Sequence, residues 1–299
     1  MYEQTNAQTR DRVFGNINMN LKLLKNFSLM VRSGIDMSNE LRYYKRPISS
    51  KKTPNGEYRE QNIISMEMNH DFMFKYDNKF GADKQIGLTA SFGGNSMIND
   101  YKNIDVRAES LQIPGVYSLS NSKDRLLTSN FESHKIINSL YGLVQLSYLS
   151  SIYLDITGRN DWSSTLPVNN NSYFYPSVSA SFIPTEYFHI KSPYLTFAKI
   201  RLSYAQVGND TKPYRLSRDY STASFGGSYF LPITANNPNL KPEMVTSYEA
   251  GTEMRFFKNS LGFDLTYYNS NSENLILQVP IDPSTGAQFS MQNAGLIKN

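Results

Sequence analysis

The chain has 299 residues, 39% hydrophobic and 19% charged, and its mean hydropathy of -0.47 excludes a polytopic helical membrane protein. It contains no cysteine, which excludes disulfides, thiolate metal sites and cysteine nucleophiles. The net charge of +4 is small and scattered, so we expect no nucleic-acid partner. Aromatic residues make up 13% of the chain, a composition that favours strands over helices.

The N-terminal half begins without an apolar export signal in residues 1–12, so an exported form of this chain would start upstream of Met1. Short segments then alternate apolar and polar residues, as strands do. These segments are 17–23, 27–31, 64–74 and 86–92.

One long uncharged stretch, residues 136–154, has the length of a membrane-spanning helix. It is rich in Tyr, Val and Ile, and it carries Asn138, Gln145 and several serines. Two strands joined at Ser150 and Ser151 therefore fit it better than a helix.

Five segments in the C-terminal half alternate most clearly: 152–159, 177–182, 199–204, 248–255 and 261–268. Because successive side chains of a strand point to opposite faces, each segment has two faces. The apolar faces carry no charge. The opposite faces carry Asp155, Arg159, Lys199, Arg201, Glu249, Glu253, Arg255 and Asp264.

The connections between the expected strands alternate short and long. They run approximately 25–26, 38–61, 76–83, 93–133, 149–151, 161–172, 184–197, 208–243 and 258–259, with the sixth and seventh nearly equal. Short turns on one side and long loops on the other are typical of an outer-membrane barrel. We therefore predict an all-β, transmembrane antiparallel β-barrel segment of about ten strands, each about ten residues long. Residues 1–299 show no internal domain boundary, and the long loops are expected to bear the binding surface.

Several motifs then follow one another in a fixed order. Residues 159–167 read RNDWSSTLP and 169–179 read NNNSYFYPSVS; 199–210 read KIRLSYAQVGND, 237–243 NPNLKPE and 248–251 YEAG. The sequence ends with STG at 284–286 and NAGLIKN at 293–299. This order resembles the SusC/RagA family of TonB-linked outer-membrane proteins. The positions matching the family motifs include Ser163, Ser164, Pro176, Ser177, Gly208, Asn209, Pro238, Leu240, Pro242, Glu243 and Gly251.

The resemblance implies a location in the outer membrane of a Gram-negative-type cell, in contact with its lipid. It also implies import of oligosaccharides or, less often, peptides, with a SusD-like surface lipoprotein as lid and the TonB complex as energy source. Family members are about three times longer and form barrels of about 22 strands. The chain would then be 10–11 strands of the C-terminal half, with the plug domain and the TonB contact absent. Trp162 and Leu166 depart from the family pattern, so the ligand class is not carried over.

Two groups of residues are candidates for contact with a ligand. Charged side chains expected at the lumen or rim would pair with each other or with the plug, or would bind ligand: Arg159, Asp161, Arg201, Glu249, Glu253 and Arg255. Loop aromatics would stack on sugars or peptide side chains, or would pack among themselves: Trp162, Tyr173, Tyr214, Tyr220, Phe225, Tyr229 and Phe230. Pro238 and Pro242 are expected to end a long loop and set the register of a strand from Val245.

The histidines give little support for catalysis, so we expect no enzyme and no cofactor. His70 and Asp71 fall on opposite faces of a strand, His134 and Glu132 share a face without a nucleophile, and His189 follows Glu186 in a short turn. Two alternatives to the importer remain: a self-contained small outer-membrane pore or adhesin, and a soluble glycan-binding β-protein.

Overall fold

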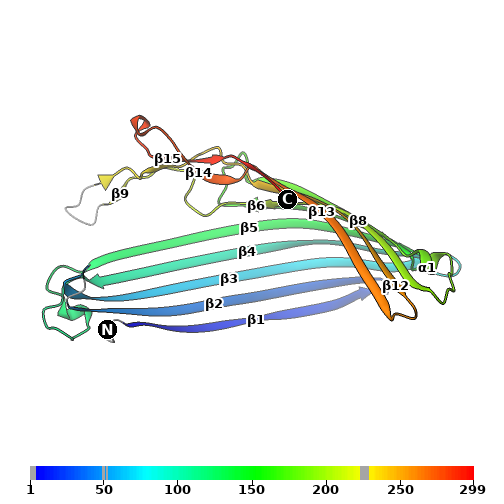
Figure 1. Cartoon of the computed structure of the whole chain (residues 1–299), viewed down its shortest axis with the longest axis horizontal. Coiled ribbons are helices and arrows are strands. Elements are labelled where there is room, and N and C mark those ends of the chain that lie inside the picture. The colour runs from blue at the N-terminus through cyan, green and yellow to red at the C-terminus, as the bar shows by residue number, and fades with distance from the viewer. Residues whose placement is uncertain (1–4, 49–50, 52, 223–228) are drawn as a thin grey trace.

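The computed structural model describes residues 5–48, 51, 53–222 and 229–299. Eleven strands form one open sheet, and each strand pairs antiparallel with its neighbour in the sheet (Figure 1). In sheet order they are β1 (Thr5–Leu24), β2 (Phe27–Ile48), β3 (Asn55–Phe80), β4 (Ile86–Ala108), β5 (Leu127–Tyr148), β6 (Ile152–Ser163), β7 (Ser172–Phe182), β8 (Leu195–Asn209), β12 (Glu243–Phe256), β13 (Leu261–Glu273) and β16 (Leu296–Lys298). The all-β prediction is therefore confirmed.

The remaining elements are short. β9 (Ser221–Thr222) pairs with β10 (Tyr229–Phe230), and β15 (Phe289–Asn293) lies between β11 (Thr234–Ala235) and β14 (Ile276–Pro280). This small sheet joins the loop after β8 to the loop after β13 (Figure 1). The helices are α1 (Pro184–Tyr187), η1 (Leu119–Asn121) and η2 (Pro283–Thr285). In the described part of the chain, no helix has the length and apolar character needed to cross a membrane.

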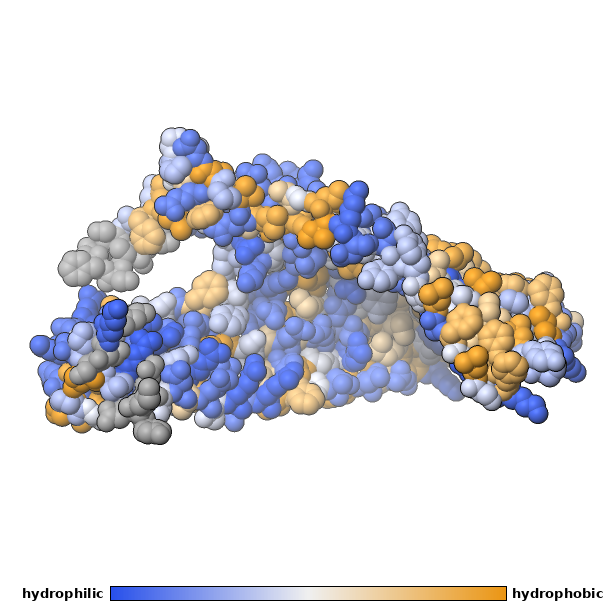
Figure 2. All heavy atoms as spheres, in the orientation of Figure 1, coloured by the Kyte–Doolittle hydropathy of each residue, from blue (hydrophilic) through white to orange (hydrophobic). Residues whose placement is uncertain are grey.

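The register separates an apolar face from a polar face, as the alternation predicts. One row across the apolar face is Leu88, Leu146, Leu154, Ala180, Leu202, Ala250 and Tyr267. The adjoining row on the polar face is Thr89, Gln145, Asp155, Ser179, Ser203, Glu249 and Tyr268. Figure 2 shows hydrophobic atoms gathered around α1 and the β12–β13 turn, and hydrophilic residues over the opposite ends of β2–β5.

The five N-terminal strands are much longer than predicted. They have 20 to 26 residues, whereas β6–β8, β12 and β13 have 11 to 15. The connections expected at 38–61 and 93–133 shrink to 49–54 and 109–126. The reason lies in the parts of these strands nearer the 49–54 and 109–126 connections, where Met66 pairs with Asp100 and Asp100 with His134. Pairing continues there although the apolar face has become polar, so apolar alternation marks only part of each strand.

The turn at 149–151 is where the sequence places it, because β5 ends at Tyr148 and β6 begins at Ile152. The stretch 136–154 is thus two strands, and the helical reading is excluded. β12 begins at Glu243, two residues before the expected start at Val245.

We call β1–β5 the long wall and β6–β8, β12 and β13 the short wall. The two walls meet at β5 and β6, whose pairing ends at Ile137 opposite Ser163. Among the described residues, 127–135 of β5 pair with β4 on one side alone. The strands of the long wall therefore extend beyond those of the short wall at the end away from α1. Loops continue the short wall in the same direction (Figure 1).

Candidate mouth and lumen surface

Two of the predicted charges form a fixed pair on the polar face of β6. Arg159 Nε donates to Asp161 Oδ1 at 2.7 Å, and a second guanidinium nitrogen donates to Ser139 Oγ at 2.8 Å. The Tyr175 hydroxyl donates to the other Asp161 oxygen at 2.8 Å. Asp161 is 5% exposed, so the carboxylate is held by its neighbours rather than open to solvent.

Arg201 forms a pair that spans three strands. From β8 it passes over Gly251 of β12 and donates to Asp264 Oδ2 of β13 at 3.0 Å and to Thr266 Oγ1 at 2.6 Å. A Cβ at Gly251 would lie 2.6 Å from Arg201 Nε, so the motif glycine makes room for this side chain.

The remaining charges of the predicted set lie on β12. Arg255 Nε donates to Glu253 Oε1 at 3.0 Å. Glu249 shares the polar face with this pair and is exposed. The six charged residues therefore lie on one face, and five of them already have partners.

The motif regions 159–167 and 199–210 meet around Asp210. This carboxylate is 8% exposed and accepts a hydrogen bond from Lys135 Nζ at 2.5 Å. It also accepts from Thr165 Oγ1 at 3.1 Å and from the Ser163 hydroxyl. A buried carboxylate stays charged at low cost only when such partners surround it. Asp210 thus ties the end of β8 to the loop after β6 and to β5.

The NPNLKPE segment is fixed beside Asp210. Leu240 is 0% exposed and packs with Leu166 and Tyr173. Glu243 Oε1 accepts from the backbone N–H of Ile276 at 2.7 Å, and its Oε2 accepts from Asn209 Nδ2 at 3.2 Å.

A reciprocal side-chain bridge joins this segment to the C-terminal loop. Asn293 Oδ1 accepts from the Lys241 N–H at 2.8 Å, and Asn293 Nδ2 donates to the Lys241 carbonyl at 2.8 Å. We call Ser163, Thr165, Leu166, Asp210, Leu240 and Glu243 the mouth anchor. The family motifs therefore converge on a cluster that holds the loops in place.

The other motif positions serve the same arrangement. Ser164 donates its N–H to the carbonyl of Ile136 at 2.9 Å, and its hydroxyl accepts the N–H of Ile136 at 2.9 Å. Ser177 pairs its hydroxyl with Thr157 at 2.5 Å, and Pro176 lies opposite Gly158. Pro238 is exposed beside the buried Leu240.

Of the two roles expected for the loop aromatics, ligand contact and packing, Tyr173 has the second. It is 7% exposed and stacks on Tyr175 with ring centroids 6.1 Å apart. A Cβ at Gly208 would lie 2.4 Å from its ring, so the absence of a side chain at Gly208 lets the ring settle there. Tyr173 therefore belongs to the support of the mouth rather than to its open surface.

Four other aromatics of this set are open to solvent: Tyr214 is 60% exposed, Tyr220 67%, Tyr229 70% and Phe230 49%. Trp162 is 38% exposed but lies in β6, on the same face as Leu154 and Ile156, so the expectation of a loop position is wrong for Trp162. Tyr214 meets Phe131 of β5 edge-on, with ring centroids 6.4 Å apart. Phe225 lies outside the described residues.

A polar hollow of about 560 Å³ opens between the loops on either side of the Lys241–Asn293 bridge. Amide side chains dominate its lining, and each offers both donors and acceptors. The lining includes Asn236, Asn237, Lys241, Asn274, Gln292 and Asn293. Sequence reasoning missed this hollow, because loop geometry brings together residues from two distant segments. It also missed Lys135 as the partner of Asp210.

The histidines lie apart from the mouth anchor. His70 Nδ1 is 3.0 Å from the Ser33 hydroxyl, and His134 Nδ1 is 2.5 Å from Asp100. His189 has a positive φ of 51° at the end of the turn after α1. Over the described ranges, no group of three or more His, Cys, Asp or Glu side chains is arranged to hold a metal ion.

Comparison with curated proteins shows relatives among TonB-dependent receptors. TonB-dependent receptor P26 of Formosa agariphila is 29% identical over 244 residues, which cover 77% of this chain and 24% of that protein. TonB-dependent receptor SusC of Bacteroides thetaiotaomicron is 25% identical over 182 residues, which cover 56% of this chain and 18% of that protein. The chain thus spans about a quarter or less of the length of these relatives.

Solved structures share the fold. The structure of the RagAB peptide transporter matches with a TM-score of 0.87 at 22% identity, covering 99% of this chain and 34% of that one. The ferric-catecholate import receptor Fiu of E. coli K12 matches with a TM-score of 0.57 at 13% identity, covering 97% of this chain and 44% of that one.

Together these matches confirm the resemblance to SusC/RagA-type proteins. The family model described as "TonB dependent receptor-like, beta-barrel" matches residues 2–299. The chain therefore belongs to the TonB-dependent receptor β-barrel family.

Proposed function

We propose that this chain forms part of the wall and the extracellular mouth of a TonB-dependent importer in the outer membrane of a Gram-negative-type cell. The observation that carries the proposal is the division of the eleven-stranded sheet into an apolar and a polar face. The apolar face keeps large side chains in solvent-accessible positions, such as Leu202 at 57%, Leu265 at 67% and Tyr267 at 70% exposed. A continuous band of this kind fits contact with lipid, because water would make it an aggregation surface.

The polar face suits a passage for hydrophilic solutes. Its charges pair mostly among themselves, so a solute meets hydrogen-bonding groups without a strong field of one sign. This arrangement supports uptake of oligosaccharides or peptides, the cargo classes that we assign to the intact protein. The work is binding and gated passage, without bond breaking and without a cofactor.

We place initial ligand contact at the mouth, on Tyr214, Tyr220 and Tyr229 and in the polar hollow. Exposed tyrosine rings offer flat apolar plates with a polar edge, which suit sugar rings and peptide side chains. On the polar face below, Arg159, Asp161, Arg201, Glu249, Glu253 and Arg255 are assigned to the wall, with Glu249 free to meet ligand.

The partners of the intact protein follow from the same placement. A SusD-like lipoprotein would cover the loops of the mouth as a lid, and the TonB complex would act through regions outside this chain. Residues 1–299 act as a single segment of the barrel, without an internal boundary.

The test is uptake by cells that carry the complete receptor together with the SusD-like lipoprotein proposed as its lid. Fluorescent oligosaccharides and a fluorescent peptide mixture are supplied in turn, with and without an active TonB complex. The proposal predicts energised uptake of one of these classes and recovery of the receptor in outer-membrane fractions. Recovery in the soluble fraction would favour a glycan-binding β-protein, and uptake that continues without TonB would favour a diffusion pore; either result overturns the proposal.

Variants locate the ligand contact. Tyr220→Ala combined with Tyr229→Ala is expected to weaken ligand binding about thirtyfold, because each stacking ring contributes of the order of 1 kcal/mol. Tyr267→Ala is the matched control, since Tyr267 is as exposed as Tyr229 but lies on the apolar face. Equal loss in the control would show that the mouth rings have no special role.

A further inference from the structure

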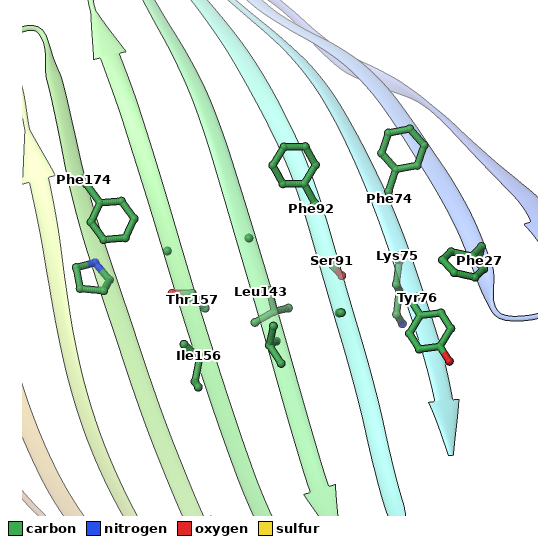
Figure 3. Close-up of a pocket in the computed structure, with 15 residues that line it drawn as sticks. Phe27, Phe74, Lys75, Tyr76, Ser91, Phe92, Leu143, Ile156, Thr157 and Phe174 are labelled. Atoms are coloured by element: carbon green, nitrogen blue, oxygen red, sulfur yellow. The ribbon is translucent and has the colours of Figure 1, made fainter. Parts of the chain in front are cut away.

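A groove crosses the apolar face from β2 to β7, away from the mouth anchor. Its volume is about 530 Å³, and its lining is almost entirely apolar. Figure 3 shows Phe74 and Phe92 on one side and Phe174 on the other, with Ile156 between them. The lining residues Lys75, Ser91 and Thr157 alternate with these positions, so their side chains belong to the polar face.

Glycines form the floor of the groove. In register across four strands lie Phe92, Gly142, Gly158 and Pro176. Two adjacent strands thus lack a side chain at the same height. The ring of Phe174 leans toward this gap, because a Cβ at Gly158 would lie 3.0 Å from it. Gly142 stays open, since a Cβ there would meet the Ser91 carbonyl oxygen at 3.8 Å and no other atom within 4 Å.

The height of the groove places it inside the apolar band. Phe92 and Pro176 lie six residues from the strand ends at Ile86 and Phe182. At about 3.3 Å per residue and a tilt of about 40°, that is roughly 15 Å above the turn side of the sheet. An apolar band is about 25 Å tall, so the groove opens near its middle.

We propose that this groove is a binding site for a hydrocarbon chain of an outer-membrane lipid. The inference rests on the membrane location proposed above. Two observations select this occupant over a polar ligand or a docked protein segment. The groove is continuous with the apolar band on its turn side, where Val144 and Ile156 pair next to the glycine row. Its outward-facing side chains include a single polar atom, the Tyr76 hydroxyl at its edge, so it offers nothing to an amide or sugar.

An empty depression at this depth would leave its walls without contacts, and a flexible chain is the component of the bilayer that can enter it. Gly142 and Gly158 then form a slot within the groove, and the slot immobilises one lipid hydrocarbon chain against the barrel. Neighbouring lipid exchanges over a convex surface. We expect the slot to be occupied more persistently than the surface around Leu265, which is 67% exposed on β13.

The experiment uses the full-length receptor in nanodiscs of phosphatidylethanolamine in which one acyl chain carries a mid-chain diazirine. After illumination, mass spectrometry of peptides maps the attached lipid. The proposal predicts labelling of the segments around Phe92, Val144, Ile156 and Phe174 at least threefold above that around Leu265. Gly142→Leu fills the slot, and its Cβ makes only an ordinary contact with the Ser91 carbonyl oxygen at 3.8 Å, so it is expected to reduce groove labelling by threefold or more without a backbone clash.

Two further variants make the result specific. Val144→Phe fills the same slot from the same strand and keeps both glycines, so it is expected to act like Gly142→Leu even if one of the two variants folds poorly. Ile152→Phe adds bulk to the apolar face at the turn end of β6 and is expected to leave groove labelling unchanged.

The failures are distinguishable. Uniform labelling of β4–β7 and β13 in the unaltered receptor, or groove labelling that both filling variants leave unchanged, overturns the lipid site while the receptor remains in the membrane. A receptor that does not insert into nanodiscs and receives no label overturns the proposed membrane location, and with it the site.

Discussion

The long wall and the short wall are secured in different ways at the strand ends that carry the long connections. The long wall continues its backbone ladder to these ends of β2–β5, and ion pairs such as Lys102–Glu132 lie on its surface. The short wall stops near Ser163 and Asn209, and its loops depend on buried side chains around Asp210 and Leu240. A ladder distributes its stability over many hydrogen bonds, whereas the mouth anchor concentrates it in a few residues. Single substitutions should therefore matter far more in the short wall.

The strongest test of this comparison is Asp210→Ala. The change leaves Lys135, with 20% of its side chain exposed, without its carboxylate partner, and it removes the acceptor of Ser163 and Thr165. Breaking a buried pair costs about 3–5 kcal/mol. Hydrogen exchange should show that loss as faster opening of residues 210–243. Lys102→Ala breaks an exposed pair of the long wall, and it should change the free energy of local opening by less than about 1 kcal/mol. Similar losses at both sites would end the distinction between the walls.

Gly251→Val tests how the short wall is held on its polar face. The new Cβ would fall 2.6 Å from Arg201 Nε, so Arg201 must leave Asp264 or β12 must shift. Overpacking of this kind costs about 1–3 kcal/mol, and thermal unfolding of the detergent-solubilised receptor should record it. Gly15→Val serves as control, because a Cβ at Gly15 meets nothing within 4 Å. Equal destabilisation by the two variants would contradict the assigned role of Gly251.

A pH test probes the cluster that closes the long wall at the end that carries the 109–126 connection. Tyr58 is 7% exposed beside Ala108 and Leu111, and burial raises its pKa from 10.0 to about 12. The folded state therefore retains the phenolic proton to higher pH than the unfolded state. Its contribution to stability is complete below pH 10 and is lost as the pH rises to about 12.

Proteolysis of the 109–126 connection should accelerate across that pH window, and Tyr58→Phe should remove this part of the dependence. Tyr173 packs against Leu166 and Leu240 of the mouth anchor, and burial raises its pKa as well, so the anchor should also lose stability at high pH. The Tyr58→Phe comparison is therefore what isolates the contribution of the long wall. A Tyr58→Phe receptor with the unaltered pH profile would refute the assignment.

The smallest effect is expected for Glu253→Gln. The Glu253–Arg255 pair lies on the polar face with Arg255 half exposed, and exposed pairs contribute about 0–1 kcal/mol. Thermal unfolding should shift by no more than a few degrees. A larger shift would mean that the polar face of the short wall also depends on single residues, and it would extend the contrast beyond the mouth anchor.

The sequence was sufficient to predict the two faces, the turn at 149–151 and the family, because lipid-facing alternation and turn residues are local signals. It could not reveal how far the strands of the long wall extend toward the 109–126 connection, because Asp100 and His134 replace apolar residues there while pairing continues. It also left open whether Tyr173 meets ligand or packs among the loops, since its burial against Leu166 and Leu240 depends on segments far apart in the chain. The Lys135–Asp210 pair joins residues 75 positions apart, a distance over which no spacing rule operates.

The sequential strand order has a consequence for how the sheet assembles. Each of β2–β8 pairs with the strand that precedes it, so the sheet can grow one hairpin at a time with little chain entropy lost at each step. The step from β8 to β12 is different, because residues 210–242 must close first. Compared with the three-residue turn before β6, that closure costs about 2 kcal/mol more. The mouth anchor stabilises the ends of this same loop. The motif residues would then set the pace of assembly as well as the shape of the mouth.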